Sequence, residues 1–465
     1  MPAKWVEYSL GDLCAEITVG HVGSMTNEYR DSGIPFFRSK NIREYRIDWD
    51  DVKYISQSFH EKLKKSTLRP GDVAVVRTGK PGTACVIPDY IDEANCSDLV
   101  IMRVNPQLLS AYFLSYYLNS VANHQINSQL VGAVQQHFNV GAAKKLSIII
   151  PDRNEQERIV KVVKDLDDKI QLNHQINQTL EQIAQAIFKS WFVDFEPVIA
   201  KIAALEAGGS DDDALLAAMQ AISGKEEAQL AHLHTEQPEY YTELRATAEL
   251  FPSAMQDGES GEIPEGWKPS TVGQEFDVTM GQSPPGDTYN EAGDGAPFFQ
   301  GRRDFGERFP SNRVYCTAPK RLANEADTLL SVRAPVGDTN VALTDCCIGR
   351  GLAALRHKSG CSSFTYYSVI QLGHELSSFD SEGTVFGSIN QKNLKAIPVV
   401  APTREALSAF KRAVGGIDEL IRVNSEEAES LTAARDTLLP KLLSGELTIT
   451  DSEDQITEAK EAADV

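Results

Sequence analysis

The chain has 465 residues, of which 42% are hydrophobic and 24% are charged, with no collagen-like or proline-rich bias. A chain of this length is expected to form two or three domains around separate cores. No apolar run approaches the about 18 residues of a membrane span, the N-terminus has no apolar signal-peptide core, and the seven cysteines include no C-x-x-C pair. We therefore expect a soluble cytoplasmic protein without a disulfide framework or a metal site.

The net charge of −21 is unevenly distributed. Residues 201–262 hold 13 acidic and 3 basic residues, and residues 401–465 hold 14 and 7. By contrast, residues 1–150 hold 15 acidic and 16 basic residues, and residues 263–400 hold 15 and 13. The two nearly neutral regions leave room for a locally basic binding face, while the acidic regions either keep the protein soluble or meet a basic partner.

Residues 1–152 are predicted to form a first α/β domain. Short apolar stretches typical of strands are separated by Gly, Pro and Asp turns, and the run LLSAYFLSYYLNSV indicates an occasional helix.

Residues 153–196 are predicted to form a long spacer helix. Its inward positions alternate steps of four and three without an interrupting proline, which is the narrow seam of a coiled coil rather than the broad stripe of a globular helix. The seam runs through Ile159, Val163, Leu166, Ile170, Asn173, Asn177, Leu180, Ala184, Ile187 and Trp191. The next segment, 197–262, is an acidic, Ala-rich linker or insert in which GGSDDD and DGESGE are typical of flexible connections.

Residues 263–402 repeat the first domain. Landmarks recur in one fixed order while the distance between them falls from 262 to 255 and then to 251 residues, as gene duplication followed by deletions would leave them. The pairs include Trp5 and Trp267, Gly33 and Gly295, Phe36 and Phe298, Asp72 and Asp327, Gly132 and Gly383, and Pro151 and Pro402.

A second long helix is predicted over residues 403–446, followed by a disordered acidic tail over 447–465. Its seam repeats the steps of the first helix through Phe410, Val414, Ile417, Ile421, Asn424, Ala428, Leu431, Arg435, Leu438 and Leu442. Asn173 and Asn424 occupy the same step, and a buried asparagine fixes the register of paired helices, so we expect the two helices to pair with each other. The alternative is that each helix packs only on its own domain.

No catalytic motif is found in the sequence. There is no F-x-G-x-G with a D/N-P-P-Y/F pair for amino-methyl transfer, no phosphate-binding G-x-x-x-x-G-K-[ST] loop, and no nuclease P-D…(D/E)-x-K set. We expect a chain that is not an enzyme and that has no bound cofactor.

Cationic and amide side chains gather in the turns of both copies. Arginine forks match guanine edges, asparagine and glutamine match adenine edges, and lysines match phosphates, so these residues are candidates for contacts with double-stranded DNA; ordinary surface ion pairs are the alternative. The candidates are Arg38, Lys40, Asn41, Arg43, Arg77, Thr78 and Lys80 in the first copy, and Gln300, Arg302, Arg303 and Arg333 in the second. Arg46, Lys53, Arg308 and Arg313 lie in the same turns.

A second polar cluster lies just before each long helix, where helix capping and DNA contact are equally good interpretations. It comprises Gln135, Gln136 and Asn139, and then Ser388, Asn390, Gln391 and Lys392.

Together these features resemble the specificity subunit of type I restriction-modification systems over nearly the whole chain. The strings that carry the resemblance are GIPFFRSKNI, RTGKPG, GQSPPGDTYNEAGDGAPFFQG, LLSVRAPVGDTNVA, CCIGRGLAALR, QAIFKSWFVDFEPV and DTLLPKLLSGEL.

The resemblance implies two α/β target-recognition domains, each gripping one half of a split, asymmetric DNA site, and two long antiparallel helices as a spacer. It also implies two modification subunits that bring S-adenosylmethionine and methylate adenine, and restriction subunits that cut DNA with ATP and Mg²⁺. It transfers no base-reading role to a particular residue, and it leaves open whether the acidic insert docks a modification subunit and whether a restriction subunit is present at all.

Two other classes of function fit the sequence less well. An acidic DNA mimic needs carboxylates spaced along its whole length, whereas here they cluster in the insert and the tail. An autonomous enzyme is disfavoured by the missing motifs.

Overall fold

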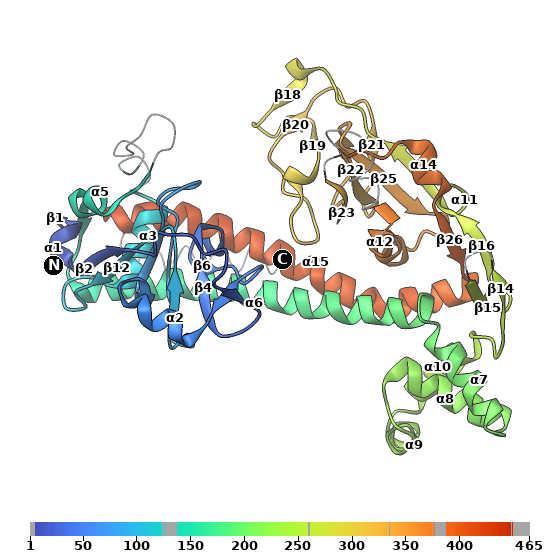
Figure 1. Cartoon of the computed structure of the whole chain (residues 1–465). Helices are drawn as coiled ribbons and strands as arrows, with labels where there is room; N and C mark the ends of the chain where they lie inside the picture. The colour runs from blue at the N-terminus through green and yellow to red at the C-terminus, as the bar shows by residue number, and fades with distance from the viewer. Residues whose placement is uncertain are drawn as a thin grey trace. The chain divides into compact units, whose positions relative to one another are not determined.

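The structure is a computed structural model that describes residues 5–122, 126, 137–258, 261–333, 335–373, 375–376, 387–447 and 449. The chain divides into two units, Met1–His174 with Glu426–Val465 (unit 1) and Gln175–Ser425 (unit 2). The boundary cuts both long helices, α6 (Arg153–Phe192) and α15 (Arg404–Ser444), so each unit holds one β-rich copy and a stretch of each helix (Figure 1).

The first copy builds three principal sheets in unit 1. A four-stranded antiparallel sheet has the order β10-β9-β12-β2, and a five-stranded sheet has the order β3-β7-β4-β11-β8 with β4 and β11 parallel. Strands β1 and β13 pair antiparallel and bring the two ends of the copy together, and a small β5-β6 hairpin follows η1. The strands are β1 Val6–Ser9, β2 Cys14–Val19, β3 Tyr29–Arg30, β4 Ile34–Phe37, β5 Ile42–Arg43, β6 Arg46–Ile47, β7 Lys53–Ile55, β8 Thr67–Leu68, β9 Val73–Val76, β10 Ala84–Val86, β11 Ala94–Cys96, β12 Leu99–Val104 and β13 Ser147–Ile150; the helices are α1 Leu10–Leu13, η1 Ser39–Asn41, α2 Gln57–Lys62, η2 Lys64–Ser66, α3 Ala111–Asn119 and α5 Val140–Lys145.

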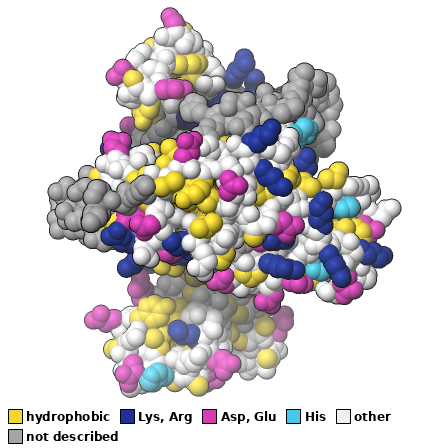
Figure 2. Space-filling model, turned by 90° about the vertical axis from the view of Figure 1, so that its left-hand side faces the viewer, with side chains coloured by type: hydrophobic (Ala, Val, Ile, Leu, Met, Phe, Trp, Pro, Cys, Tyr) yellow, Lys and Arg dark blue, Asp and Glu magenta, His cyan; other side chains and the backbone are white. Residues whose placement is uncertain are grey.

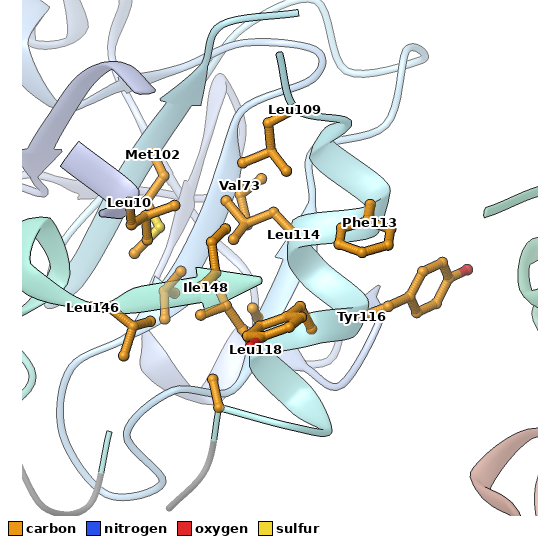
Figure 3. Close-up of a cluster of buried hydrophobic side chains, with 14 of the residues drawn as sticks. Leu10, Val73, Met102, Leu109, Phe113, Leu114, Tyr116, Leu118, Leu146 and Ile148 are labelled. Atoms are coloured by element: carbon orange, nitrogen blue, oxygen red, sulfur yellow. The ribbon is translucent and has the colours of Figure 1, made fainter. Parts of the chain in front are cut away.

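The core of unit 1 lies between the four-stranded sheet and α3. Val73 and Met102 from the sheet meet Phe113 and Leu114 from the helix, and all four are fully buried (Figure 3). Strand β9 reads VAVV and is buried throughout, as expected of a strand covered on both faces. Each such side chain contributes about 1.5–3 kcal/mol on burial, which is the main force that holds the sheet to the helix.

The second copy repeats the order of the three principal sheets in unit 2, with a single bridge between Phe305 and Pro310 in place of the β5-β6 hairpin. Its sheets have the orders β23-β22-β25-β17, β18-β20-β19-β24-β21 and β16-β26, again with one parallel pair, β19 and β24. The strands are β16 Lys268–Thr271, β17 Phe276–Met280, β18 Tyr289–Asn290, β19 Ala296–Phe299, β20 Tyr315–Cys316, β21 Leu322–Ala323, β22 Thr328–Val332, β23 Val336–Val341, β24 Cys346–Ile348, β25 Leu352–His357 and β26 Pro398–Ala401; the helices are α11 Val272–Glu275, η3 Gly286–Thr288, η4 Arg302–Asp304, α12 Ser362–Gln371 and α14 Gln391–Ala396.

The structure explains why the repeat distance drifts and why certain landmarks persist. The fall from 262 to 255 residues comes from α2, which has no counterpart between β20 and β21. Asp72 binds Arg103 at 3.3 Å, and the matching Asp327 binds Arg356 at 2.6 Å. In each copy a buried aspartate therefore pairs with an arginine of the neighbouring strand, which is half-buried in the first copy and exposed in the second.

The two long helices pair with each other in both units, and they run antiparallel. In unit 1, Asp167 of α6 meets Arg435 of α15, and Asn173 meets Glu427. In unit 2, Asn177 meets both Ile421 and Asn424. Along the predicted seam, the residues that are buried are Ile159, Val163, Leu166, Ile170, Asn173, Phe410, Val414, Ile421, Asn424 and Leu438, and those that are half-buried are Leu180, Ile187, Ile417 and Leu431.

Asn173 and Asn424, which occupy the same step of the repeat, have different partners on the opposite helix. Asn173 donates to Glu427 Oε2 at 2.7 Å, and it is Asn177 whose side-chain oxygen accepts from Asn424 at 3.0 Å. Antiparallel helices bring different steps of the repeat together, so two asparagines at the same step do not meet each other. The helix ends also enter the cores of the β-rich copies, through Val163 and Leu442 in unit 1 and Phe188 and Phe410 in unit 2. Packing on a copy and pairing with the other helix therefore occur together.

The acidic insert is folded rather than a flexible linker. It contains α7 (Glu196–Glu206), α8 (Asp211–Ser223), α9 (Glu227–Glu236) and α10 (Pro238–Glu249), followed by the hairpin β14 (Met255–Gly258) and β15 (Gly261–Pro264). The GGSDDD string, expected to be flexible, starts α8, where Ser210 and Asp213 form a capping box. Met219, Leu230 and Ala248 pack into a small core of the insert's own. Of the predicted disordered tail, residues 448 and 450–465 lie outside the described residues.

Candidate DNA interface

The candidate residues of the first copy surround a groove in unit 1. Its volume is about 590 Å³, and one wall is formed by the loop after β4 and by the turn between β9 and β10. Four of the predicted residues line it, namely Lys40, Arg43, Thr78 and Lys80. The opposite wall belongs to the long helices, with Asp167, Gln171 and His174 from α6 and Arg435 from α15. The groove is therefore polar, and it is cationic on the side of the loops.

One carboxylate organises the cations of this loop. Asp51 accepts from Lys40, Lys53 and Arg38, the last at 3.2 Å. The hydrogen bonds from Lys40, then Lys53 and then Arg38, hold the pKa of the Asp51 carboxyl well below its usual value, so it stays ionised. The cations are held side by side without being neutralised, because three of them share a single negative charge.

A second carboxylate organises the turn after β9. Asp98 accepts from Thr78 and, at 3.0 Å, from Ser39 Oγ, and its carboxylate lies 3.9 Å from Arg77. Thr78 and Arg77 are half-buried as a result, while Lys80 remains exposed in a surface pair with Glu44. Of this group, Lys80 is the residue best placed to meet a phosphate.

Asn41 does not belong to the candidate set. It is fully buried, its Oδ1 accepts from the Arg38 backbone at 3.1 Å, and its Nδ2 donates to the carbonyl oxygens of Asp48 and Asp50. Both ends of the amide are used inside the protein, so the predicted adenine contact is corrected to a structural role. Asp304 does the same in the second copy, accepting from the Gln300 backbone at 2.7 Å.

The second copy presents fewer cations. Arg302 pairs with Asp338 at 2.6 Å, and Gln300, Arg303 and Arg333 are exposed. Arg313 binds the buried Asp304 at 2.7 Å. Arg308, which lies in the same turn, is buried between the two helices, where it binds Glu181 and Asp418 and cannot reach DNA from that position.

Arg77 and Arg333 are not equivalent, although the strings around them look alike. The Arg77 carbonyl accepts from Phe138 at 3.1 Å, and its counterpart by the same bond is Val332, which accepts from Ile389. Arg333 therefore matches the position of Thr78, one residue further along; Arg333 is exposed, whereas Thr78 is half-buried.

The second polar cluster contains helix caps. Asn139 accepts from Ala142 N and Asn390 accepts from Asn393 N, each at 2.9 Å, as the N-caps of α5 and α14. The Gln391 side chain donates to the Val278 carbonyl at 3.3 Å. Gln135 and Gln136, like the landmarks Gly132 and Gly383, lie outside the described residues.

Several residues of the groove were missed at the level of sequence. Gln171 and His174 line it, and Asp51 and Asp98 organise it. Arg46, which the sequence placed in the same turn as the candidates, also lines the groove. The sequence could have identified one further residue of the groove, Arg435. It is a charged residue within an apolar seam, so it must find a buried partner there. For the two aspartates no signal existed, because their partners come from other strands.

The surface carries charges of both signs. On the face shown in Figure 2, Lys and Arg side chains lie among acidic and apolar ones. Within the described ranges, no three His, Cys, Asp or Glu residues are grouped so that they could hold a metal ion. Among the helices that the structure describes, none is long and apolar enough to cross a membrane.

Comparison with known proteins agrees with this architecture. The sequence model of the protein family described as the type I restriction modification DNA specificity domain matches residues 2–182. The HindI specificity subunit of Haemophilus influenzae is 29% identical over 96% of this chain and 100% of its own length. A putative MjaX specificity subunit of Methanocaldococcus jannaschii is 26% identical over 97% of this chain and 95% of its own. The crystal structure of a type I S subunit from M. genitalium shares the fold, with a TM-score of 0.51 at 15% identity over 95% of this chain and 96% of that one.

Two β-rich copies in one chain, each packed on paired helices and each presenting a polar loop, define a DNA specificity protein. The chain is similar over nearly its whole length to DNA specificity subunits of type I restriction-modification systems. Within such a system the specificity subunit is the component that is not catalytic.

Proposed function

We propose that this subunit directs its complex to a split, asymmetric DNA sequence, one half of which is read by residues 1–152 and the other by residues 263–402. The observation that supports this most strongly is the equivalence of the loops after β4 and β19. Both follow the same parallel strand pair, yet one carries Arg38, Lys40 and Arg43 and the other carries Gln300, Arg302 and Arg303. Equal scaffolds with different polar loops suit two different half-sites.

The partners follow from this role. We propose that two modification subunits bind this chain and supply S-adenosylmethionine and adenine methylation, and that restriction subunits add ATP- and Mg²⁺-dependent cleavage in the cytoplasm. The chain itself contributes sequence choice and geometry. Lys40, Arg43 and Lys80 face phosphates or base edges, Arg302, Arg303 and Arg333 do so in the second copy, and Arg38, Arg77 and Thr78 shape the loops that carry them.

Expression of the chain with its modification subunit, followed by methylome sequencing, tests the proposal. We expect methylation of one bipartite motif that disappears when this chain is omitted. The chain alone should show no methyl transfer, DNA cleavage or ATP hydrolysis above a mock preparation. Methylation that is independent of this chain, or turnover by the pure chain, would contradict the proposal.

A further inference from the structure

The loop after β4 and the loop after β19, which we call the recognition loops, begin and end at equivalent positions of the two copies. The Asn41 carbonyl accepts from Asp48 N at 2.8 Å, and the Asp304 carbonyl accepts from Ser311 N at 2.8 Å, so the loops align at a shift of 263 residues. At this shift Tyr45 and Arg308 occupy the same position, two to eight residues beyond the candidate DNA contacts of the same loops.

In unit 2, Arg308 ties its loop to both long helices. Its Nη1 lies 2.7 Å from Glu181 of α6, and its Nη2 lies 2.8 Å from Asp418 of α15. The guanidinium also lies 3.7 Å from the centre of the Tyr366 ring, and Nη1 donates to the Tyr367 hydroxyl at 3.1 Å. The side chain is 9% exposed, so the cluster is shielded from water.

In unit 1 the guanidinium between the loop and the helices comes from a long helix rather than from the loop. Arg435 projects from α15, binds Asp167 of α6 at 2.7 Å, and lies 4.7 Å from the centre of the Tyr45 ring of the loop. Tyr45 in turn contacts Tyr116 of α3, with 5.2 Å between ring centres. Burial raises the pKa of Asp167 against the opposing effect of Arg435, which marks the site as poorly solvated.

The two clusters are related by the duplication except for the arginine. At the shift of 251 residues that relates the long helices and α3 to α12, Asp167 matches Asp418 and Tyr116 matches Tyr367. Arg435 matches Ala184, which is fully buried in the core of unit 2. The first copy therefore takes its guanidinium from the helix, and the second copy takes it from the loop.

A buried ion cluster is an expensive way to hold two surfaces together, because apolar side chains of equal volume stabilise such a contact at least as well. The cluster instead restricts the position of the loop relative to the helices, because a planar guanidinium can bind two carboxylates at once in only one orientation. We propose that Arg308 and Arg435 are positioning residues that fix each recognition loop on the paired helices, and thereby determine the distance and angle at which the half-sites are read. This inference rests on the proposed function.

The test uses the full chain in complex with its modification subunit and duplexes in which the two half-sites are separated by the native spacer, one base pair less or one more. A triple variant, Arg308→Met, Glu181→Gln and Asp418→Asn, removes the cluster without leaving a buried charge. We expect its preference for the native spacer to fall about tenfold, while affinity for each half-site changes little. Amide hydrogen exchange in residues 302–310 should become faster.

Two further variants keep the result interpretable. Tyr45→Leu removes the ring in the first copy without exposing a charge, and it should relax the spacer preference in the same way even if the triple variant folds poorly. Arg356→Met is the matched control, because it breaks an ion pair of the same unit that does not reach the helices, and it should lower the melting temperature but leave the spacer preference intact.

Wild-type spacer preference and wild-type exchange in both the triple variant and Tyr45→Leu would overturn the inference, and so would a relaxed spacer in Arg356→Met. If the wild-type complex itself showed no preference for a bipartite sequence, the proposed function would fail and this inference with it. An intermediate spacer preference in Arg308→Lys, which keeps the charge but lacks the fork, would support the geometric role.

Discussion

The Asn424 side-chain amide donates a 3.0 Å hydrogen bond to Asn177 Oδ1, and this pair is buried where the two long helices face each other. Asn177 uses its own amide to reach the Ile421 carbonyl and Ser425 Oγ, at 3.2 Å and 3.0 Å. Polar groups at a helix seam lower stability but restrict the register, since a shifted alignment would leave them unsatisfied.

The first prediction concerns this pair. Asn424→Leu alone should lower the free energy of unfolding by about 1–3 kcal/mol, because Asn177 loses a buried partner. The double replacement Asn177→Leu with Asn424→Leu should recover most of that loss, since two apolar side chains then face each other. Denaturant unfolding of Asn177→Leu, Asn424→Leu and the double variant, each compared with the wild-type protein, forms a double-mutant cycle. Additive losses would show that the two asparagines do not interact.

The second prediction concerns the independence of the two copies. Replacing residues 1–152 with the equivalent region of another specificity subunit should change one half of the methylated motif and leave the other half intact. The reason is that the β1-β13 pairing closes the first copy on itself, so the exchange is made at adjacent ends of a folded region. Methylome sequencing gives the answer, and a change in both halves would contradict separate reading.

The third prediction separates reading residues from structural ones. Arg333→Ala should weaken specific binding by about 1–3 kcal/mol and relax the preference at one position if the exposed guanidinium contacts a base. Arg77→Ala should instead lower stability, because this side chain is half-buried beside Asp98. Uniform loss over all sequences with a shallower salt dependence would assign Arg333 to a phosphate.

The fourth prediction is a pH effect confined to unit 2. Burial lowers the pKa of His357 below its usual 6.5, against the opposing effect of Glu275, and the ring packs edge-on against Phe276 and Phe364. The unfolded chain thus binds the proton more readily than the folded chain does, so stability is complete above about pH 6.5 and is lost as the pH falls from there toward the folded pKa.

The first copy supplies the control for this effect, because Val104 occupies the position of His357 in β12. His357→Val should remove the part of the acid sensitivity that comes from unit 2. Melting temperatures of both proteins at about pH 7.5 and about pH 5.5 measure it. An equal loss in the two proteins would show that other groups are responsible.

Sequence patterns predicted the large elements well and the contacts between distant elements poorly. Heptad spacing predicted helices over 153–196 and 403–446, and the structure has them at Arg153–Phe192 and Arg404–Ser444, because the periodic pattern of buried residues is a local property of the sequence. The duplication predicted two matching α/β regions, which the sheet orders confirm.

The site shows where local patterns stop being informative. Asn41 looked like an adenine reader, yet its amide closes its own loop, and Arg308 looked like a surface cation, yet it is buried against two helices. Their roles depend on which distant segments pack against them. The insert was misjudged for a related reason, since its composition suggested a linker, whereas the spacing of Leu215, Met219 and Leu230 builds a small helical core.

The last prediction concerns the distance between the half-sites. The boundary between the two units crosses α6 at His174–Gln175 and α15 at Ser425–Glu426, so residues added there extend the paired helices without entering either β-rich core. Because the helices run antiparallel, the same insertion must be made in both.

Four residues in each helix add about one turn and about 6 Å, and they keep the seam nearly in phase. We expect this variant to assemble and to methylate both half-sites with a spacer that is one or two base pairs longer, since B-DNA advances about 34 Å in each turn of about 10 base pairs. Insertion of two residues in each helix should instead rotate the seam by about half a turn and impair folding. Methylome sequencing of the two variants distinguishes the outcomes, and an unchanged spacer in the four-residue variant would show that the helices do not set the distance.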